Sequence, residues 1–304
     1  MSQETSSTEE RNILARIFLS PNEPRLRAGW RLLVQTLLVG LVNFLLGGIT
    51  SLLGIPELTG KWGLLLRQFL ELIRYVLSIY IARRWLDKRS FVSLGLKVSR
   101  QALLDVLAGI GIMFVLMGLI YGVMSSLGWV TFEGFAWEYD ATGTVIWNTL
   151  IFLVIFLLVG WNEELLSRGY HLQTIASGLN LFWAVILSSA FFGLLHINSP
   201  HATWVSTTGI IFAGLFQAYA YIRTKQLWLP IGLHLGWNFF EGVVFGFPVS
   251  GLDIYALTRM RVSGPALWTG GEFGPEAGLI ILPALIVGCA LIYCVTRKRK
   301  NIGT

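Results

Sequence analysis

The run VIWNTLIFLVIFLLVGWNEELLSRGY, from Val145 to Tyr170, decides how this chain folds. Its first part, Val145–Gly160, is almost entirely apolar, and Glu163, Glu164 and Arg168 follow directly after it. Ionisable groups at such a depth in hydrocarbon are costly unless they pair with each other or line a wet cavity. The run therefore predicts a membrane-spanning helix that carries a functional site near its end.

The composition is that of a membrane protein. The chain has 304 residues, of which 54% are hydrophobic and 13% charged, and its mean hydropathy is +0.65. A soluble domain carries about 25% charged residues, so too few are present to cover a surface that faces water. We predict a multi-pass protein of the cell membrane whose surroundings are the lipid bilayer. The net charge of +6 is no sign of nucleic-acid binding, and we expect no nucleic-acid partner.

Eight apolar runs are long enough, or nearly so, to cross about 30 Å of hydrocarbon. The predicted fold class is therefore all-α, a polytopic bundle of about eight transmembrane helices. The runs lie at Trp30–Leu53, Trp62–Ala82, Leu103–Leu127, Val145–Trp161, Leu181–Ile197, Thr207–Ile222, Trp228–Phe247 and Ala277–Val295.

The distribution of basic residues predicts the orientation of the bundle. With the N-terminus inside, the cytoplasmic segments hold 18 Lys and Arg residues and the outer segments hold 3. Cytoplasmic loops carry such an excess, so both termini are expected to be cytoplasmic. This gives a cytoplasmic N-terminal tail at 1–28, a transmembrane domain at 29–296 with its core at about 145–240, and a basic cytoplasmic tail at 297–304.

The second span carries charges of its own. Arg67, Glu71 and Arg74 are spaced so that they share one helical face. One interpretation is a buried charge network that holds two helices together. The other is that these side chains form a wall of the active cavity.

Three polar motifs recur in the second half of the chain, each within an apolar run. They are Glu163-Glu164-x-x-x-Arg168, Phe192-x-x-x-His196 and His234-x-x-x-Asn238. Spans four and five are antiparallel, so residues at equal depth are equally far from the turn that joins them. Glu163 and His196 meet this condition around the turn at 177–180 if both arms are continuous helix.

Helical geometry separates the roles of the neighbouring glutamates. Glu164 and Arg168 are four residues apart on one helical face and can form an ion pair. His234 and Asn238 have the same spacing, so their side chains can point in the same direction. Glu163 is rotated by about 100° from Glu164 around the helix, so the two carboxylates cannot share one role.

These residue types fit hydrolysis of an amide bond, in either of two ways. In one, a desolvated carboxylate is the general base, a histidine orients the attacking water, and a second histidine with an asparagine stabilises the oxyanion. In the other, Glu163, His196 and His234 bind a divalent metal such as zinc, which activates the water. The sequence has no His-Glu-x-x-His helix and no Gly-x-Ser-x-Gly elbow, so soluble zinc-protease geometry and a nucleophilic serine are disfavoured.

The order of these motifs resembles that of the CPBP family, the CAAX prenyl protease and bacteriocin-processing intramembrane proteases, also called the Abi family. The resemblance covers about Val145–Phe240, with weaker likeness at 88–96 and 270–276. It implies that Glu163 and His196 activate water and that His234 and Asn238 stabilise the oxyanion or coordinate metal. It also implies that Glu164, Arg168 and Phe192 support the site. Ser167 departs from the family, in which this position is often aromatic.

The resulting prediction is an intramembrane endopeptidase, of metallo- or glutamate-dependent type. Its substrate would be a peptide or membrane-protein segment, which could be prenylated or bear a leader. A transporter or proton pathway could use the same buried charges, but its charges would be spread along a route across the membrane. A non-catalytic immunity or scaffold relative is the remaining alternative.

Overall fold

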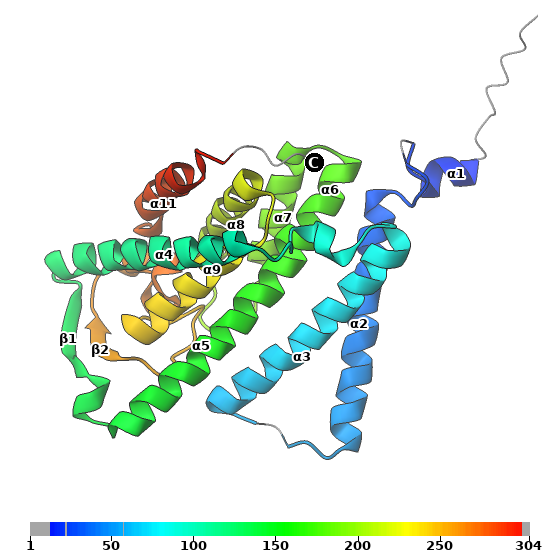
Figure 1. Ribbon diagram of the computed structural model, residues 1–304. Helices are drawn as coiled ribbons and strands as arrows, with labels where there is room; N and C mark the ends of the chain where they lie inside the picture. The colour runs from blue at the N-terminus through cyan, green and yellow to red at the C-terminus, as the bar shows by residue number, and fades with distance from the viewer. Residues whose placement is uncertain (1–12, 22, 57, 300–304) are drawn as a thin grey trace, which may run out of the picture.

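The computed structural model describes residues 13–21, 23–56 and 58–299 as a helical bundle. A long helical run, α5 (Thr142–Glu164) continued by η4 (Leu165–His171) and α6 (Leu172–Gly178), crosses the molecule (Figure 1). It packs between α3 (Gly60–Ile81) on one side and α9 (Trp228–Asn238) on the other.

The remaining elements surround this run. The other α-helices are α1 (Ile13–Phe18), α2 (Ala28–Leu52), α4 (Arg100–Ser126), α7 (Leu181–Leu195), α8 (Trp204–Thr224), α10 (Ala266–Thr269) and α11 (Ile281–Thr296). The π-helical segments besides η4 are η1 (Ala82–Leu86) and η5 (Phe239–Val244). Short 3-10 turns are η2 (Phe91–Leu94), η3 (Ala136–Glu138), η6 (Gly271–Phe273) and η7 (Pro275–Ala277).

Each of the eight predicted spans coincides with a helix, but the helices differ in their suitability to cross a membrane. Four among the described residues are long and apolar enough, namely α2, α4, the run 142–178 and α8. Helices α7 and α11 are apolar but shorter. Helix α3 has 22 residues and carries the charges at 67, 71 and 74. The protein is therefore a helical membrane protein, whereas eight crossings and two cytoplasmic termini stay predictions.

A small sheet adds to the predicted all-helical fold. Strands β1 (Val130–Phe135) and β2 (Thr258–Val262) pair antiparallel, and neither strand is predicted from the sequence. They lie in the loops after the third and the seventh predicted spans, which the eight-span topology places on the same side of the membrane. Two strands can pair only if their loops lie on the same side. Arg261 on β2 forms an ion pair with Glu133 on β1 at 2.8 Å.

Helix α9 is held very close to α4. A Cβ atom added at Gly232 would lie 2.3 Å from the Val106 carbonyl oxygen, and one at Gly109 would lie 2.5 Å from the Leu233 nitrogen. Only glycine fits at such backbone distances. This contact fixes the helix that carries His234.

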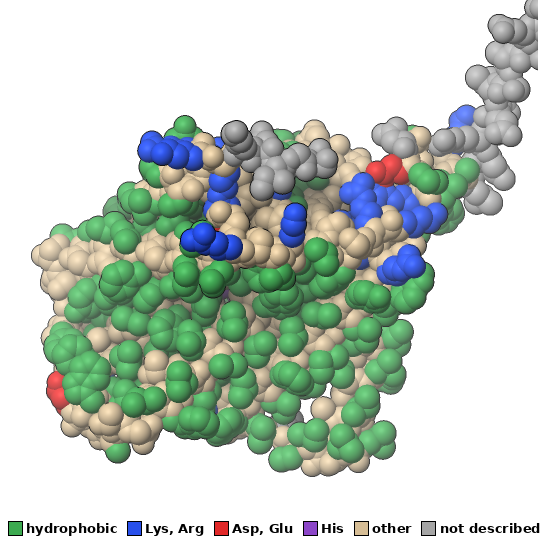
Figure 2. All heavy atoms as spheres, in the orientation of Figure 1, with side chains coloured by type: hydrophobic (Ala, Val, Ile, Leu, Met, Phe, Trp, Pro, Cys, Tyr) green, Lys and Arg blue, Asp and Glu red, His purple; other side chains and the backbone are tan. Residues whose placement is uncertain are grey.

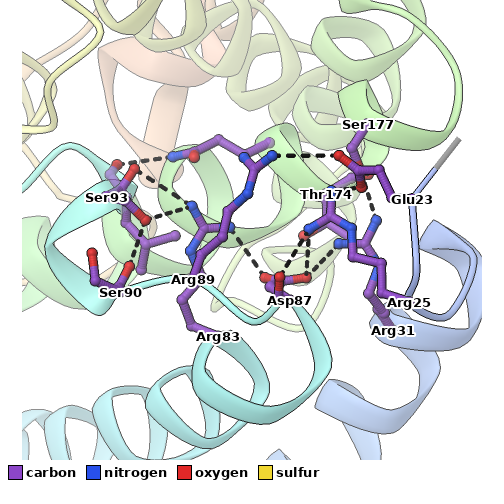
Figure 3. Close-up of polar contacts among 12 residues, drawn as sticks. Glu23, Arg25, Arg31, Arg83, Asp87, Arg89, Ser90, Ser93, Thr174 and Ser177 are labelled. Atoms are coloured by element: carbon purple, nitrogen blue, oxygen red, sulfur yellow. Dashed lines mark hydrogen bonds and ion pairs between the residues drawn. The ribbon is translucent and has the colours of Figure 1, made fainter. Parts of the chain in front are cut away.

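A cluster of charges joins the N-terminal segment to the end of the long run. We call it the Asp87 cluster; it consists of Arg25, Arg31, Arg83 and Asp87, all buried (Figure 3). Asp87 forms ion pairs with Arg31, with Arg83 at 3.1 Å and with Arg25 at 3.7 Å. Arg31 also donates a hydrogen bond to the Ser177 hydroxyl at 2.6 Å. The cluster thereby ties α2 and η1 to the end of α6.

Basic side chains gather at one end of the molecule. Figure 2 shows Lys and Arg along the edge where the Asp87 cluster lies and a mostly hydrophobic surface beyond it. The cytoplasmic ends of membrane helices carry this excess of basic residues, which supports the predicted orientation.

Candidate active site

The long run changes from α- to π-helical geometry inside the first motif. Segment η4 (Leu165–His171) is π-helical, and all of its residues are buried. Such π-bulges in α-helices often mark functional sites, because the extra residue turns side chains away from their regular spacing. The run nevertheless continues to Gly178, so the arm between Glu163 and the turn is helical throughout.

Glu163 meets two histidines from two other helices. Its Oε2 atom lies 3.7 Å from His196 Nε2, just after the end of α7, and 3.7 Å from His234 Nε2 on α9. Glu163 Oε2 is buried and has no hydrogen-bond partner among the described residues. The structure thus brings together three of the predicted site residues around one carboxylate oxygen.

The second nitrogen of each histidine is held by an acceptor. His196 Nδ1 lies 2.9 Å from the Phe192 carbonyl oxygen, and His234 Nδ1 lies 2.8 Å from Glu164 Oε1. A carbonyl or carboxylate oxygen can only accept, so each Nδ1 is assigned as the N–H donor. In a neutral ring Nε2 then carries a lone pair, and both Nε2 atoms face Glu163. Three acceptors that converge in this way favour a water molecule or a cation between them.

Glu164 and Arg168 form the pair that their spacing predicts. Both are buried, and Arg168 Nη1 lies 2.9 Å from Glu164 Oε1. Arg168 also donates to the Gly214 carbonyl on α8 at 2.9 Å, and its guanidinium lies 4.5 Å from the centre of the Phe192 ring. The same ring meets His234 edge to face at 6.1 Å. These residues therefore hold α5, α7, α8 and α9 together around the site.

A cavity of about 1020 Å³ opens beside Glu163. Asn238 lines it and is only 7% exposed; its amide makes no side-chain hydrogen bond to another described residue. Ser167 lines it as well and is a small side chain. The other polar side chains in the wall include Asn43, Arg67, Gln68, Glu71, Arg74, Gln217, Ser250 and Glu276.

The charges of α3 fit both interpretations of the second span. Arg67, Glu71 and Arg74 all line the cavity. Glu71 pairs with Arg74 at 3.2 Å, and Arg74 donates to Asn43 on α2 at 3.0 Å, so the network also joins two helices. It is not fully buried, because the Arg67 side chain is 70% exposed.

The donors around Glu163 are of the types that zinc prefers. Two imidazole nitrogens and a carboxylate are common zinc ligands, and both rings have the Nδ1 support that metal-bound histidines show. As placed, however, the described side chains include no group of three or more His, Cys, Asp or Glu residues that could hold a metal ion. The donor types fit a metal but their arrangement does not, so we assign no step to one.

Two further carboxyl groups lie near this site, and the motifs did not reveal them. Glu276 lines the cavity, and Glu241 is buried. Glu241 lies inside the predicted span Trp228–Phe247. An ionisable residue in an apolar run is the same signal that singled out Glu163, and it could have found Glu241.

Comparison with known proteins covers the part of the chain that holds the motifs. Residues 145–240 match the sequence profile of the Rce1-like family, the type II CAAX prenyl endopeptidase Rce1-like proteins. This segment belongs to the CPBP, or CAAX-protease, family. The CAAX-protease segment contains every predicted site residue, whereas Glu241 and Glu276 lie beyond it.

A relative of the CAAX-protease segment occurs in Bacillus subtilis (strain 168). It is named "Putative membrane peptidase YdiL" and is 30% identical over 100 residues. The match covers 33% of this chain and 39% of the relative, so the chain spans less than half of that relative's length. No solved structure matches the chain.

Proposed function

We propose that this protein is a multi-pass intramembrane endopeptidase that hydrolyses a peptide bond with a water molecule activated by Glu163 and His196. The observation that carries the proposal is the convergence of Glu163 Oε2 with the Nε2 atoms of His196 and His234, each at 3.7 Å. These distances are too long for direct hydrogen bonds and suit a water that bridges them.

Glu163 is the general base. Its side chain is 26% exposed and lines the cavity, where a water can reach it. The carboxylate takes a proton as the water oxygen bonds to the substrate carbonyl carbon, and the Nε2 lone pair of His196 accepts the second hydrogen and fixes the water's orientation. General bases placed in this way accelerate reactions by about 10² to 10⁴.

Asn238 and His234 stabilise the oxyanion. The Asn238 amide faces the cavity and is free to donate. His234 donates from Nε2 only when its ring carries a second proton, and Glu164, 2.8 Å from Nδ1, favours that charged ring. Donors placed in advance at a developing negative charge are among the strongest contributors to catalysis.

The substrate class is a peptide or a membrane-protein segment. The cavity of about 1020 Å³ is large enough for several side chains and is walled in part by α2 and α3. Because the matching family is described as CAAX prenyl endopeptidases, a farnesylated peptide with a CAAX end is the first probe. The same peptide without the lipid, and a leader-bearing peptide, are its comparisons.

The proposal is tested with purified protein reconstituted in lipid vesicles. Glu163→Ala and His196→Ala should each reduce cleavage to a residual rate that only long incubations detect, and leave the melting temperature close to that of the wild type. Glu272→Ala is the matched control, because Glu272 is 82% exposed and away from the cavity wall. Near-wild-type turnover in either site variant would contradict the assignment. A proton pathway would instead give proton flux into the vesicles and no peptide cleavage.

Metal dependence has its own test. The proposed mechanism needs no metal, whereas zinc held by Glu163, His196 and His234 is the alternative. We expect turnover to persist after chelation in samples that elemental analysis proves to be metal-free. Loss of turnover on chelation, with recovery on adding back zinc, would show that the alternative is correct.

A further inference from the structure

The turn between the sheet and α11 fits tightly against the rest of the molecule. Gly274 has a φ angle of +112°, and a Cβ atom there would lie 2.2 Å from the Pro248 carbonyl oxygen. On the other side, a Cβ atom at Gly209 of α8 would lie 2.1 Å from the Glu276 carbonyl oxygen. Glycine at both positions lets this turn dock, and docking places the Glu276 side chain in the cavity wall.

Ser250 holds one oxygen of that carboxyl group. Its backbone nitrogen donates to Glu276 Oε1 at 2.6 Å, and its hydroxyl donates to the same oxygen at 2.7 Å. Ser250 adopts a φ angle of +48°, a conformation that is unfavourable for a residue with a side chain. These two hydrogen bonds hold the carboxyl group of Glu276 in one place, and the residue is only 4% exposed.

A second carboxyl group is buried beside the first. Glu241 on η5 is fully buried; the Glu276 backbone nitrogen and the Trp237 ring nitrogen lie near its carboxyl group, but neither makes a hydrogen bond of normal geometry to it. Its charge and that of Glu276 lie within electrostatic range of each other. No described Lys or Arg side chain forms an ion pair with either residue. A charged His234 ring acts on Glu276 but forms no ion pair with it, and two neighbouring buried carboxyl groups without a paired cation are not both ionised, so the pair retains at least one proton.

This proton lies beside the proposed hydrolytic site. Glu276 lines the same cavity as Glu163, and both His196 and His234 are near enough to act on its charge. Hydrolysis of an amide needs an acid as well as a base, because an amine leaves only after its nitrogen has been protonated. Glu276 on η7 and Glu163 on α5 are separate carboxyl groups that line one cavity. One of them can therefore be the acid while the other is the base.

We propose that Glu276 is a second catalytic residue of this site, the acid that protonates the leaving nitrogen, and that Glu241 is the buried partner which keeps a proton on the pair. The inference rests on the proposed endopeptidase function. The O–H bond of Glu276 breaks as the N–H bond forms, and the carbon–nitrogen bond then breaks to release the amine. Glu276 regains a proton through cavity water from Glu163, which took it from the attacking water.

The test compares two bonds in one peptide sequence. One substrate is the peptide that the wild type cleaves best, and the other replaces its scissile amide with an aryl ester, whose phenolate leaves without being protonated. Glu276→Gln should lower amide turnover about 100-fold or more and leave ester turnover within about threefold of the wild type. Glu276→Asp should recover part of the amide turnover. Glu272→Gln, in the same segment but 82% exposed, should change neither rate.

Three outcomes would overturn the inference. Equal loss of amide and ester turnover would make Glu276 structural, and unchanged amide turnover would leave it without a role. Loss confined to peptides with a Lys side chain, with the norleucine counterparts unaffected, would make it a binding site for a substrate cation. Failure of the endopeptidase function itself looks different, because then the wild type cleaves neither bond, or Glu163→Ala still cleaves both.

Discussion

The molecule contains two groups of buried charge that differ in how their carboxylates are paired. In the Asp87 cluster, Asp87 meets three arginines, and Arg31 and Arg83 find further acceptors in the Ser177 and Ser93 hydroxyls. Around Glu163, the Nε2 atoms of two histidines each lie 3.7 Å from the buried Oε2 atom, which has no hydrogen-bond donor among the described residues.

The difference lies in what each group leaves for a ligand. The carboxylate of Asp87 is buried among three arginines and does not line the cavity, so its role is to hold segments together. The Nε2 atoms of His196 and His234 lie 3.7 Å from Glu163 Oε2, too far for a direct hydrogen bond, and the three residues border the cavity. Buried polar groups are nearly always paired, so an unpaired carboxylate oxygen beside a cavity indicates chemistry, whereas a carboxylate that is paired with arginines indicates structure.

The largest expected effect on stability belongs to the Asp87 cluster. Asp87→Asn removes the negative charge between three arginines and should cost about 3–5 kcal/mol of unfolding free energy. Burial, and then the charge of Arg31, already lower the pKa of Arg25, and the other carboxylate paired with Arg25, that of Glu23, is partly exposed. Denaturation in detergent measures the loss, and Asp253→Asn in an exposed loop is the control. Unchanged stability, or a folded fraction that no longer cleaves peptide, would contradict the comparison.

A smaller effect, on rate alone, is expected at the open site. Asn238→Ala removes a proposed oxyanion donor and should lower kcat about 10²- to 10³-fold, or about 2.7–4 kcal/mol of barrier. KM and the melting temperature should change little, since the amide makes no hydrogen bond to other described side chains. Steady-state kinetics with melting curves separate these quantities. A variant that melts early but keeps kcat would place Asn238 among the structural residues.

The smallest effect is expected from the exposed end of the α3 charges. Arg67→Gln breaks only the 3.3 Å pair with Glu71, and the Arg67 side chain is 70% exposed. Such a pair contributes roughly 0–1 kcal/mol, so the melting temperature should stay close to the wild-type value. If Arg67→Gln lowered the stability as much as is expected for Asp87→Asn, exposed and buried ion pairs of this protein would not differ in their contribution to stability.

Most of the helices could be predicted because each needs only a local apolar run. The two strands could not, since β1 and β2 pair across more than a hundred residues of chain and neither has a strong pattern of its own. Likewise, the sequence places Arg25 and Arg31 only among the basic residues of the cytoplasmic side, because it is the fold that brings them to Asp87.

The site could be predicted where one helix or one turn decides the geometry. The Glu164–Arg168 pair follows from a four-residue spacing, and the level of Glu163 and His196 follows from counting outward from the turn at 177–180. The Gly214 carbonyl that accepts from Arg168, and the turn that brings Glu276 to the cavity, depend on packing between distant segments.

The account's central claim is that Glu163 and His196 act on one water molecule, and a double-mutant cycle tests it most directly. Residual peptide turnover is measured over long incubations for Glu163→Gln, His196→Ala and the double variant in the same vesicles. Residues that act as a unit lose their contribution together, so the double variant should be no slower than the slower single variant. Losses that multiply would show that the two residues act independently, and would contradict the account.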